Sequence, residues 1–340
     1  MAKVVVTGAT GFIAGHVILQ LLDAGHEVIG TARSASKADA LSKVLSDYAG
    51  KPVSIPVRAA DLSSDDGWAE AVEGADYVHH IASPIPNFVP KDADELIIPA
   101  RDGALRVLKA AQAAGVKRVV MTSSMAAVAY GWGNRRPALL TEEHWSDDTN
   151  LKDNTPYTRS KTIAERAAWD YVNGEGKGLE LTTINPAAVL GPVMSGDFSA
   201  SVEILTQLLS GKLPAAPRVG FVIVDVRDVA AAHVAAMTAP EAAGQRFLVG
   251  DKFMWFAEVA EVLRREFPAY ARKLPKGVMP DGLVKFIAMV NPPAKQILPE
   301  LGRERHISSD NAKRRLGWQP RSAEEAIVSG AKSLVKYGVV

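Results

Sequence analysis

Short apolar runs alternate with longer segments of helical spacing through the first half of the chain. The apolar runs, which predict strands, are Lys3–Thr7, Glu27–Ala32, Val53–Val57, Asp76–Ala82, Arg118–Ser123 and Leu179–Asn185. The segments with helical periodicity are Phe12–Ala24, Ser34–Tyr48, Asp65–Val72, Asp92–Ala114, which Pro99 is expected to kink or divide, and Tyr157–Val172. Because the strands are continuous apolar runs, we expect a parallel sheet covered on both faces, which is a doubly wound α/β fold.

The second half of the chain has a looser pattern in which prolines recur. Helical spacing persists at Val202–Leu209, Val226–Met237, Trp255–Phe267 and Ala323–Lys336. We therefore expect residues 1–190 to form a Rossmann-type domain that carries the chemistry. Residues 191–340 are expected to form mainly a smaller, mostly helical substrate lobe, from which some segments can return to the sheet.

Composition narrows the class of protein. A chain of 340 residues suits one large domain, or a larger and a smaller one that share a cleft. The net charge of +1 gives no reason to expect nucleic acid or a membrane as partner. The absence of cysteine excludes disulfides, thiolate metal sites and a cysteine nucleophile. Glycines interrupt the apolar N-terminus and no run of 18 apolar residues occurs, so a cytoplasmic protein is the simplest interpretation.

A glycine-rich turn follows the first predicted strand and opens the first predicted helix. Gly8 permits a tight turn, Gly11 lets the backbone approach a pyrophosphate, and Ala14 keeps the helix close to the sheet. The helix N-terminus offers free N–H groups and a partial positive charge to that anion. The alternative is a ligand-free turn, but its place in a βαβ series favours a dinucleotide. The expected contacts are Thr7, Gly8, Thr10, Gly11, Phe12 and Ile13.

The end of the second predicted strand bears on the choice of dinucleotide. NAD-binding proteins of this kind place an acid there to hold the ribose 2′-OH, whereas this chain has Arg33, with Lys37 and serines nearby. A guanidinium pairs well with a 2′-phosphate, so we expect NADP(H) rather than NAD. The alternative is that Arg33 is an ordinary solvated residue. Asp61 and Leu62, after the third predicted strand, are placed to meet the adenine.

Tyr157 and Lys161 stand four residues apart at the start of the helix that follows the fifth predicted strand. Side chains with this spacing share one helix face, about 5–6 Å apart at Cβ. A nearby ammonium favours the phenolate of a tyrosine, and hence proton transfer at the phenol. The pair is weak evidence alone, but this position places it above the cofactor crevice. Ser123 and Ser124 end the fifth strand, where a hydroxyl can bind a carbonyl oxygen or simply satisfy the backbone.

These motifs together resemble a known family. The segments Thr7–Ala14, Ser123–Ser124, Tyr157–Lys161 and Asn185–Pro192 resemble the extended short-chain dehydrogenase/reductases over the whole chain. Two further segments, His80–Pro84 and Ala167–Trp169, are similar to the branch of dihydroflavonol, cinnamoyl-CoA and aldehyde reductases, and Ser309–Pro320 resembles the closing segment of many members. The implied activity is NADPH-dependent reduction of an aldehyde or ketone to an alcohol.

The resemblance also implies roles for particular residues. Tyr157 protonates the carbonyl oxygen. Lys161 lowers the pKa of the Tyr157 phenol and binds the nicotinamide ribose. Ser124, the last serine of the run, orients the substrate. Further cofactor contacts are expected from Ala82, Ser83, Thr122, Pro186 and Val189. A pocket for hydrophobic or aromatic carbonyls, in a monomer or homodimer, is expected from Ser83, Pro84, Ser124, Met125, Trp132, Met194 and Phe198.

Some residues differ from the family pattern, and two alternative functions also belong to this fold. An asparagine common in the family is replaced near Ala100, and the tract before Tyr157 lacks the cinnamoyl-CoA reductase signature, which argues against a CoA thioester. A sugar-nucleotide epimerase or dehydratase shares the fold, although Met125-Ala126 stand where dehydratases often have Asp-Glu. A non-catalytic NADP-binding regulator is the third possibility, but such proteins typically lose the Tyr or the Lys.

Three other polar groups have structural explanations. His79 and His80 lie on a predicted buried strand with alternating directions, so we expect a core or cofactor-wall role and no metal site. Asp228 is interpreted as a helix cap or packing anchor. The last group, a basic surface expected to be solvated, comprises Arg303, Arg305, Arg314 and Arg315.

Overall fold

The computed structural model describes residues 1–84, 90, 92–196, 202–291, 295 and 297–340. Its centre is a seven-stranded sheet in the order β10-β6-β5-β4-β1-β2-β3, in which every pairing is parallel. The strands are β1 (Lys3–Val6), β2 (Glu27–Ala32), β3 (Val57–Ala59), β4 (Tyr77–His80), β5 (Arg118–Thr122), β6 (Glu180–Pro186) and β10 (Arg246–Val249). The expected doubly wound parallel sheet is therefore confirmed.

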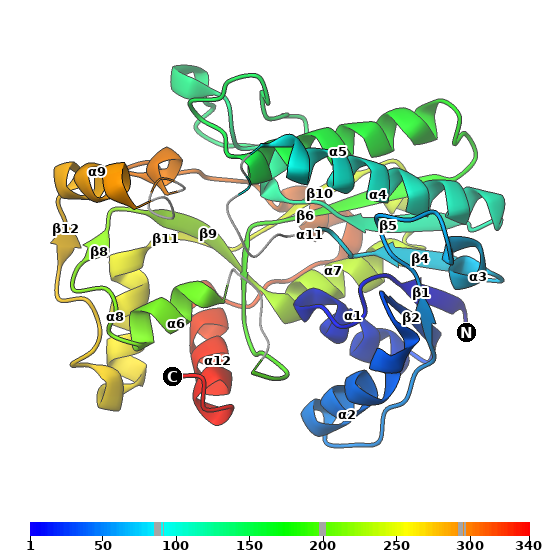
Figure 1. The fold of residues 1–340 in the computed structure, drawn as a ribbon, viewed down its shortest axis with the longest axis horizontal. Helices are drawn as coiled ribbons and strands as arrows, with labels where there is room; N and C mark the ends of the chain where they lie inside the picture. The colour runs from blue at the N-terminus through cyan, green and yellow to red at the C-terminus, as the bar shows by residue number, and fades with distance from the viewer. Residues whose placement is uncertain (85–89, 91, 197–201, 292–294, 296) are drawn as a thin grey trace.

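Helices cover both faces of this sheet (Figure 1). One layer contains α1 (Phe12–Asp23), α2 (Ala38–Ala49) and α7 (Val226–Thr238), and the other contains α3 (Trp68–Val72), α4 (Asp94–Ala113) and α5 (Pro156–Asn173). Val4 and Val6 of β1 are buried in the core under the first layer, whereas Val5 is buried in the core under the second. Apolar residues at successive positions are thus buried on opposite faces, which explains the continuous apolar runs.

A smaller lobe is built mainly from the second half of the chain. It contains a three-stranded sheet and a two-stranded one, with helices packed around them (Figure 1). The strands are β7 (Ala188–Leu190), β8 (Ala216–Pro217), β9 (Gly220–Asp225), β11 (Lys252–Trp255) and β12 (Val278–Met279). The helices are α6 (Glu203–Leu209), α8 (Phe256–Glu266), α9 (Asp281–Val290) and α12 (Ala323–Lys336), while α11 (Asp310–Leu316) contacts β10 and α7.

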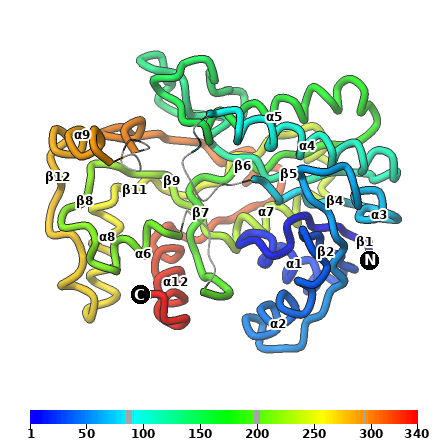
Figure 2. Tube along the Cα trace, viewed as in Figure 1, coloured from blue at the N-terminus to red at the C-terminus, as the bar shows by residue number. Residues whose placement is uncertain are grey.

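Two segments of the second half belong to the main sheet layers. β10 forms the edge strand beside β6, and α7 packs against α1. The C-terminus nevertheless ends beside α12 in the smaller lobe, away from the N-terminus at β1 (Figure 2). Among the described residues, no helix combines the length and the apolar character needed to cross a membrane.

The third strand was misplaced by the sequence pattern. Val53–Val57 was expected, but β3 is Val57–Ala59. Val53 and Ile55 are indeed buried, which produced the apolar pattern. Pro56 has no N–H to donate, and the segment is linked to β2 by the bond from the Gly30 N–H to the Pro56 carbonyl (2.9 Å). Further along the chain, α4 continues through Pro99 without a break.

Candidate active site

The glycine-rich turn lies where the strand order reverses, between the carboxyl ends of β1 and β4. Gly8 has a φ of 64°, and a Cβ there would lie 3.0 Å from the Cα of Ala82. The turn after β1 therefore packs closely on the end of β4. Gly11 is the N-cap residue just before α1 and makes no side-chain cap, and the N–H groups of Phe12 and Ile13 have no backbone acceptor among the described residues. This cradle suits a pyrophosphate.

The Thr7 side chain faces the end of β4. Its hydroxyl oxygen accepts from the N–H groups of Ile81 and Ala82, both at 3.0 Å, and lies 3.0 Å from Nδ1 of His80. With two donors on the oxygen, the hydroxyl proton points to the His80 ring. Burial lowers the pKa of His80 to about 3, so this ring accepts as a neutral imidazole. Thr7 therefore fixes the two strand ends that frame the crevice.

The His79 ring has a different partner. It lies 3.3 Å from the ring of His233 on α7, whose other nitrogen lies 2.9 Å from the Thr122 hydroxyl. Burial lowers the pKa of both histidines. Within the described part of the chain, no group of three or more His, Asp or Glu side chains could hold a metal ion. The Thr122 side chain, an expected cofactor contact, is thus bonded to α7.

Arg33 lies just beyond β2 with its side chain exposed. Asp61 follows the neighbouring strand β3. Hydrogen bonds from Ser63 hold the pKa of the Asp61 carboxyl below its usual range, and the charges of Arg33 and Arg106 lower it further. Arg33 is therefore close enough to Asp61 to act on it electrostatically. A cation and a carboxylate flank this edge of the crevice, which fits a phosphate and an adenine as neighbours.

Other residues predicted for that edge have local roles. Ser34 caps a short 3₁₀ turn, Ala35–Lys37, by accepting from the Ser36 N–H at 3.3 Å. Lys37 ends this turn with its side chain exposed. Leu62 packs against Gly103 of α4, where a Cβ would lie 2.9 Å from that of Leu62.

The N-terminus of α5 positions the tyrosine and the lysine. Thr155 caps the helix by accepting from the Thr158 N–H, the Thr158 hydroxyl accepts in return, and Pro156 occupies the first helical position. This firm start places Tyr157 in the first turn and Lys161 one turn later. The ammonium of Lys161 lies 5.8 Å from the centre of the Tyr157 ring. The expected pair is therefore brought together on one face.

The structure separates the two serines at the end of β5. The Ser123 hydroxyl is bonded to Glu165, whereas the Ser124 hydroxyl accepts from the Ala126 N–H at 3.1 Å and lies close enough to the Tyr157 phenol to lower its pKa. Surrounding protein raises the pKa of Tyr157, and the bond from Ser124 lowers it in part. Tyr157 exposes 39% of its surface, so a substrate can still reach it. This geometry gives a physical reason to assign Ser124 rather than Ser123 to the reacting group.

Lys161 is 8% exposed and donates to the Ser83 hydroxyl at 3.0 Å. Burial lowers its pKa to about 8, although the Glu165 carboxylate opposes that fall. Ser83 was expected near the cofactor or the substrate, and it lies beside the predicted catalytic lysine. Ser83, Ser124, Tyr157 and Lys161 therefore form one connected site on three elements.

Three further side chains beneath the site, those of Glu165, Arg246 and Asn185, were not predicted from the sequence. Glu165 is completely buried beneath Ser123 and forms an ion pair with Arg246 at 2.7 Å. The available signal was its spacing, since Tyr157, Lys161 and Glu165 recur every four residues on one helix face. An acidic residue that continues this spacing into the buried part of the helix indicates that its carboxylate has a partner inside the protein.

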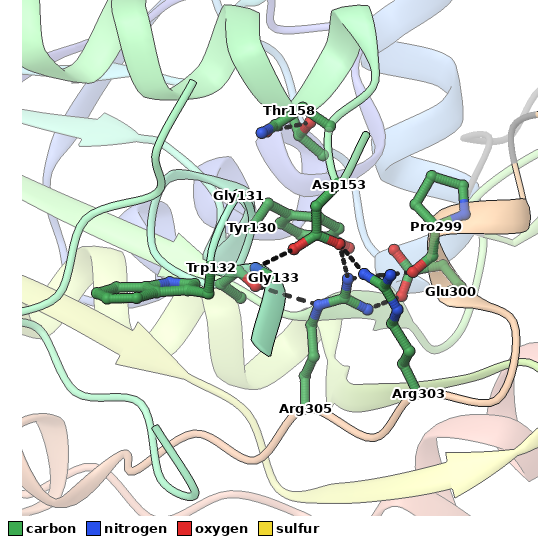
Figure 3. Close-up of polar contacts among 12 residues, drawn as sticks. Tyr130, Gly131, Trp132, Gly133, Asp153, Thr158, Pro299, Glu300, Arg303 and Arg305 are labelled. Carbon is green, nitrogen blue, oxygen red and sulfur yellow. Dashed lines mark hydrogen bonds and ion pairs between the residues drawn. The ribbon is translucent and has the colours of Figure 1, made fainter. Parts of the chain in front are cut away.

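One expectation about the basic residues is wrong. Arg305 is 3% exposed, and it forms ion pairs with Glu300 and with Asp153, the latter at 3.4 Å (Figure 3). Its guanidinium also lies 4.2 Å from the centre of the Tyr130 ring. Arg303 pairs with the same Asp153 carboxylate. The two ion pairs with Asp153 bind the segment before α5 to the segment after α9, and their large sequence separation had concealed them.

Asp228 acts as a packing anchor rather than a cap. It is 2% exposed and accepts from the Arg321 N–H at 2.6 Å and from the Arg321 guanidinium. The cap of α7 is Asp225, which accepts from the Arg227 N–H at 2.8 Å. Of the two roles expected for Asp228, the structure supports the anchor.

The remaining predicted contacts lie on several different elements. Pro186 and Val189 are buried at the end of β6 and in β7. Met125 is buried in the core, and Trp132 donates from its ring to the Val128 carbonyl at 2.8 Å. Met194 packs against α1, because a Cβ on Gly15 would lie 2.7 Å from its sulfur. Pro84 is half-buried, and Phe198 lies outside the described residues.

Comparisons with known proteins agree with this geometry. A model of the NAD dependent epimerase/dehydratase family matches residues 4–250. Cinnamoyl-CoA reductase 1 of Arabidopsis thaliana is 37% identical over 269 residues, with coverage of 78% of this chain and 75% of that protein. The ketoreductase azaE of Aspergillus niger is 36% identical over 297 residues, with coverage of 83% and 87%.

The fold comparison points the same way. The crystal structure of the yeast methylglyoxal/isovaleraldehyde reductase Gre2 complexed with NADPH has a TM-score of 0.79, 28% identity and 99% coverage of both chains. The chain belongs to the NAD-dependent epimerase/dehydratase family, that is, to the extended short-chain dehydrogenase/reductases. Within this family it lies in the branch of carbonyl-reducing oxidoreductases, so the expected family and class of enzyme are confirmed.

Proposed function

We propose that this protein uses NADPH to reduce an aldehyde or ketone to the alcohol. The proposed substrate is a hydrophobic or aromatic carbonyl compound. The observation that carries the proposal is the Ser124–Tyr157–Lys161 arrangement beside the glycine cradle. The reductases among its relatives, and the NADPH complex of Gre2, support both the reaction and the cofactor. Arg33, on an edge without a strand-two acid, is the proposed partner of the 2′-phosphate.

Each side chain of the site has its own role at the substrate carbonyl group. Ser124 and Tyr157 donate hydrogen bonds to the carbonyl oxygen and polarise it, and Tyr157 then transfers its phenol proton to that oxygen. Lys161, when charged, stabilises the phenolate that remains. When bound, reduced nicotinamide supplies the hydride to the carbonyl carbon. Ser83 holds the Lys161 ammonium in place through the bond of 3.0 Å.

The sheet layers and the smaller lobe are proposed to have separate tasks. Residues 1–190 bind the cofactor and carry the reacting groups, while residues 191–340 mainly form the substrate side. The residues proposed to line the substrate pocket are Ser83, Pro84, Ser124, Met125, Trp132, Met194 and Phe198. A cytoplasmic location and a monomeric or homodimeric state stay predictions.

NADPH oxidation at 340 nm tests the proposal over a panel of aromatic aldehydes, aryl ketones and β-keto esters. A hydroxycinnamoyl-CoA thioester and NADH are the matched controls. We expect turnover of at least one carbonyl class, with NADPH strongly preferred and the thioester inactive. Activity with NADH alone would overturn the assignment of Arg33, and turnover of the thioester alone would overturn the substrate class.

A sugar-nucleotide epimerase would behave differently. It interconverts a UDP-sugar without net oxidation of the cofactor, so chromatography of UDP-glucose and UDP-galactose provides a separate measurement. Interconversion of the sugars without carbonyl turnover would favour this second function. If wild type and Tyr157→Phe were equally inactive on both panels, a non-catalytic NADP-binding regulator would be favoured.

A further inference from the structure

Glu165 is a fully buried carboxylate beneath the predicted catalytic residues. It lies on α5 one turn after Lys161, and none of its surface is exposed. A carboxylate in the protein interior is strongly destabilised unless hydrogen bonds and opposite charge replace its hydration. The surroundings of Glu165 supply both.

Both carboxylate oxygens are saturated with donors. Three strands of the sheet and α5 itself contribute these groups, so Glu165 joins four elements at one point. The donors are the hydroxyl of Ser123, the amide of Asn185 (2.6 Å), the hydroxyl of Thr183 (3.0 Å), Nε of Arg246 (2.7 Å) and the ring N–H of Trp169 (3.3 Å).

Two of these partners are connected to Ser124, the predicted substrate-binding serine, one through the chain and the other through a hydrogen bond. Ser123 precedes Ser124 in the chain, and its hydroxyl is bonded to Glu165. Asn185 contacts the carboxylate with its amide nitrogen, which also donates to the Ser124 carbonyl at 3.2 Å. The backbone that carries Ser124 is therefore held on both sides through one carboxylate.

The charges around Lys161 are few. On its own helix it faces Tyr157 and Glu165, and from β4 it faces the His80 ring, whose protonation its charge opposes. Arg246 on β10 lies behind Glu165, paired with it and stacked 3.7 Å from the centre of the Trp145 ring. Among the described residues, Glu165 is the carboxylate that acts on Lys161, and it is paired on its other side with Arg246.

We propose that Glu165 is a positioning residue of the reductase site: its carboxylate holds the end of β5 that carries Ser124 and supplies the buried negative charge that Lys161 faces. The inference rests on the proposed function insofar as Lys161 acts there in catalysis. Glu165 contacts no reacting atom and acts through Ser123, Asn185 and Lys161. Removing its charge and removing the charge of Arg246 should therefore change Lys161 in opposite directions.

Three variants test this role. Glu165→Gln keeps the shape and removes the anion, whereas Arg246→Gln removes the cation that neutralises it. Glu180→Gln is the matched control, because Glu180 forms a similar pair with the buried Arg118 (2.7 Å) at the opposite end of β5 and β6. Each variant is assayed for the pH dependence of kcat/KM at saturating NADPH, and for the titration of Lys161 by ¹³C NMR of labelled lysine, assigned with Lys161→Arg.

The expected result is a pair of opposite shifts. Glu165→Gln should move the alkaline limb and the Lys161 titration to lower pH by about one unit. Arg246→Gln should move both to higher pH, and Glu180→Gln should leave them in place. Unshifted titrations in folded Glu165→Gln and Arg246→Gln would overturn the inference, as would equal shifts in all three variants.

The two assays keep this inference separate from the proposed function. The NMR titration reports on Lys161 without turnover, so it stands even if no carbonyl is reduced. If Glu165→Gln does not fold, as circular dichroism would reveal, Arg246→Gln decides, and the absence of an upward shift there overturns the inference.

Discussion

The burial of Lys161 predicts an alkaline limit to activity. Its pKa falls from 10.5 to about 8, mainly because burial disfavours the charged form. At pH 7 roughly nine-tenths of the enzyme carries a charged Lys161, and at pH 9 about one-tenth does. If only the charged form stabilises the Tyr157 phenolate, kcat/KM falls as pH rises through about 8, and is about tenfold lower at pH 9 than at its plateau.

The assay is carbonyl reduction at saturating NADPH from pH 6 to 10, with the best substrate of the panel. The test variant is Lys161→Arg, because a guanidinium stays charged over this range. Its activity is expected to be low but without the limb near pH 8. Lys177→Arg, an exposed site beyond α5, is the control and should retain the wild-type profile. A wild-type profile that stays flat to pH 10, or a limb that persists in Lys161→Arg, would refute the reasoning.

Three further substitutions test other parts of the site. Tyr157→Phe removes the proton donor and should lower kcat roughly 10²–10⁴-fold while NADPH binding, followed by fluorescence, is retained. Arg33→Ala should raise the KM for NADPH about 10–100-fold and leave NADH kinetics unchanged, since it removes a charge-assisted contact. Gly8→Ala places a Cβ at positive φ and 3.0 Å from Ala82, so NADPH should bind at least about tenfold more weakly in calorimetry. Unchanged values in these assays would contradict the corresponding assignments.

Much of the fold follows from local patterns in the sequence. The continuous apolar runs around Val5 and Val78 reflect strands buried on two faces, and the Thr155–Pro156 start of α5 follows ordinary capping chemistry. The displaced β3 shows where such patterns fail. Val53 and Ile55 are buried like strand residues, but proline prevents the ladder that would make a strand there.

The site was predictable wherever chemistry depends on near neighbours in the chain. Gly8 follows from the turn, and Tyr157 with Lys161 from helical spacing. Arg305 and Glu165 were missed because their partners are distant in sequence: Arg305 pairs with Asp153, and Glu165 with Arg246. A buried ion pair can be recognised only when both partners are known to lie close together in space. The sequence alone presents each arginine as a charge that solvent would ordinarily hydrate.

The most direct test of the central claim is hydride transfer itself. The wild-type enzyme is supplied with NADPH deuterated at the transferring position of the nicotinamide and with a carbonyl substrate, and the product is analysed by mass spectrometry and NMR. The account predicts one alcohol per NADPH oxidised, with one deuterium on the former carbonyl carbon and none on oxygen after exchange into water. Alcohol without the label, or NADPH that remains unoxidised while a sugar nucleotide is epimerised, would contradict it.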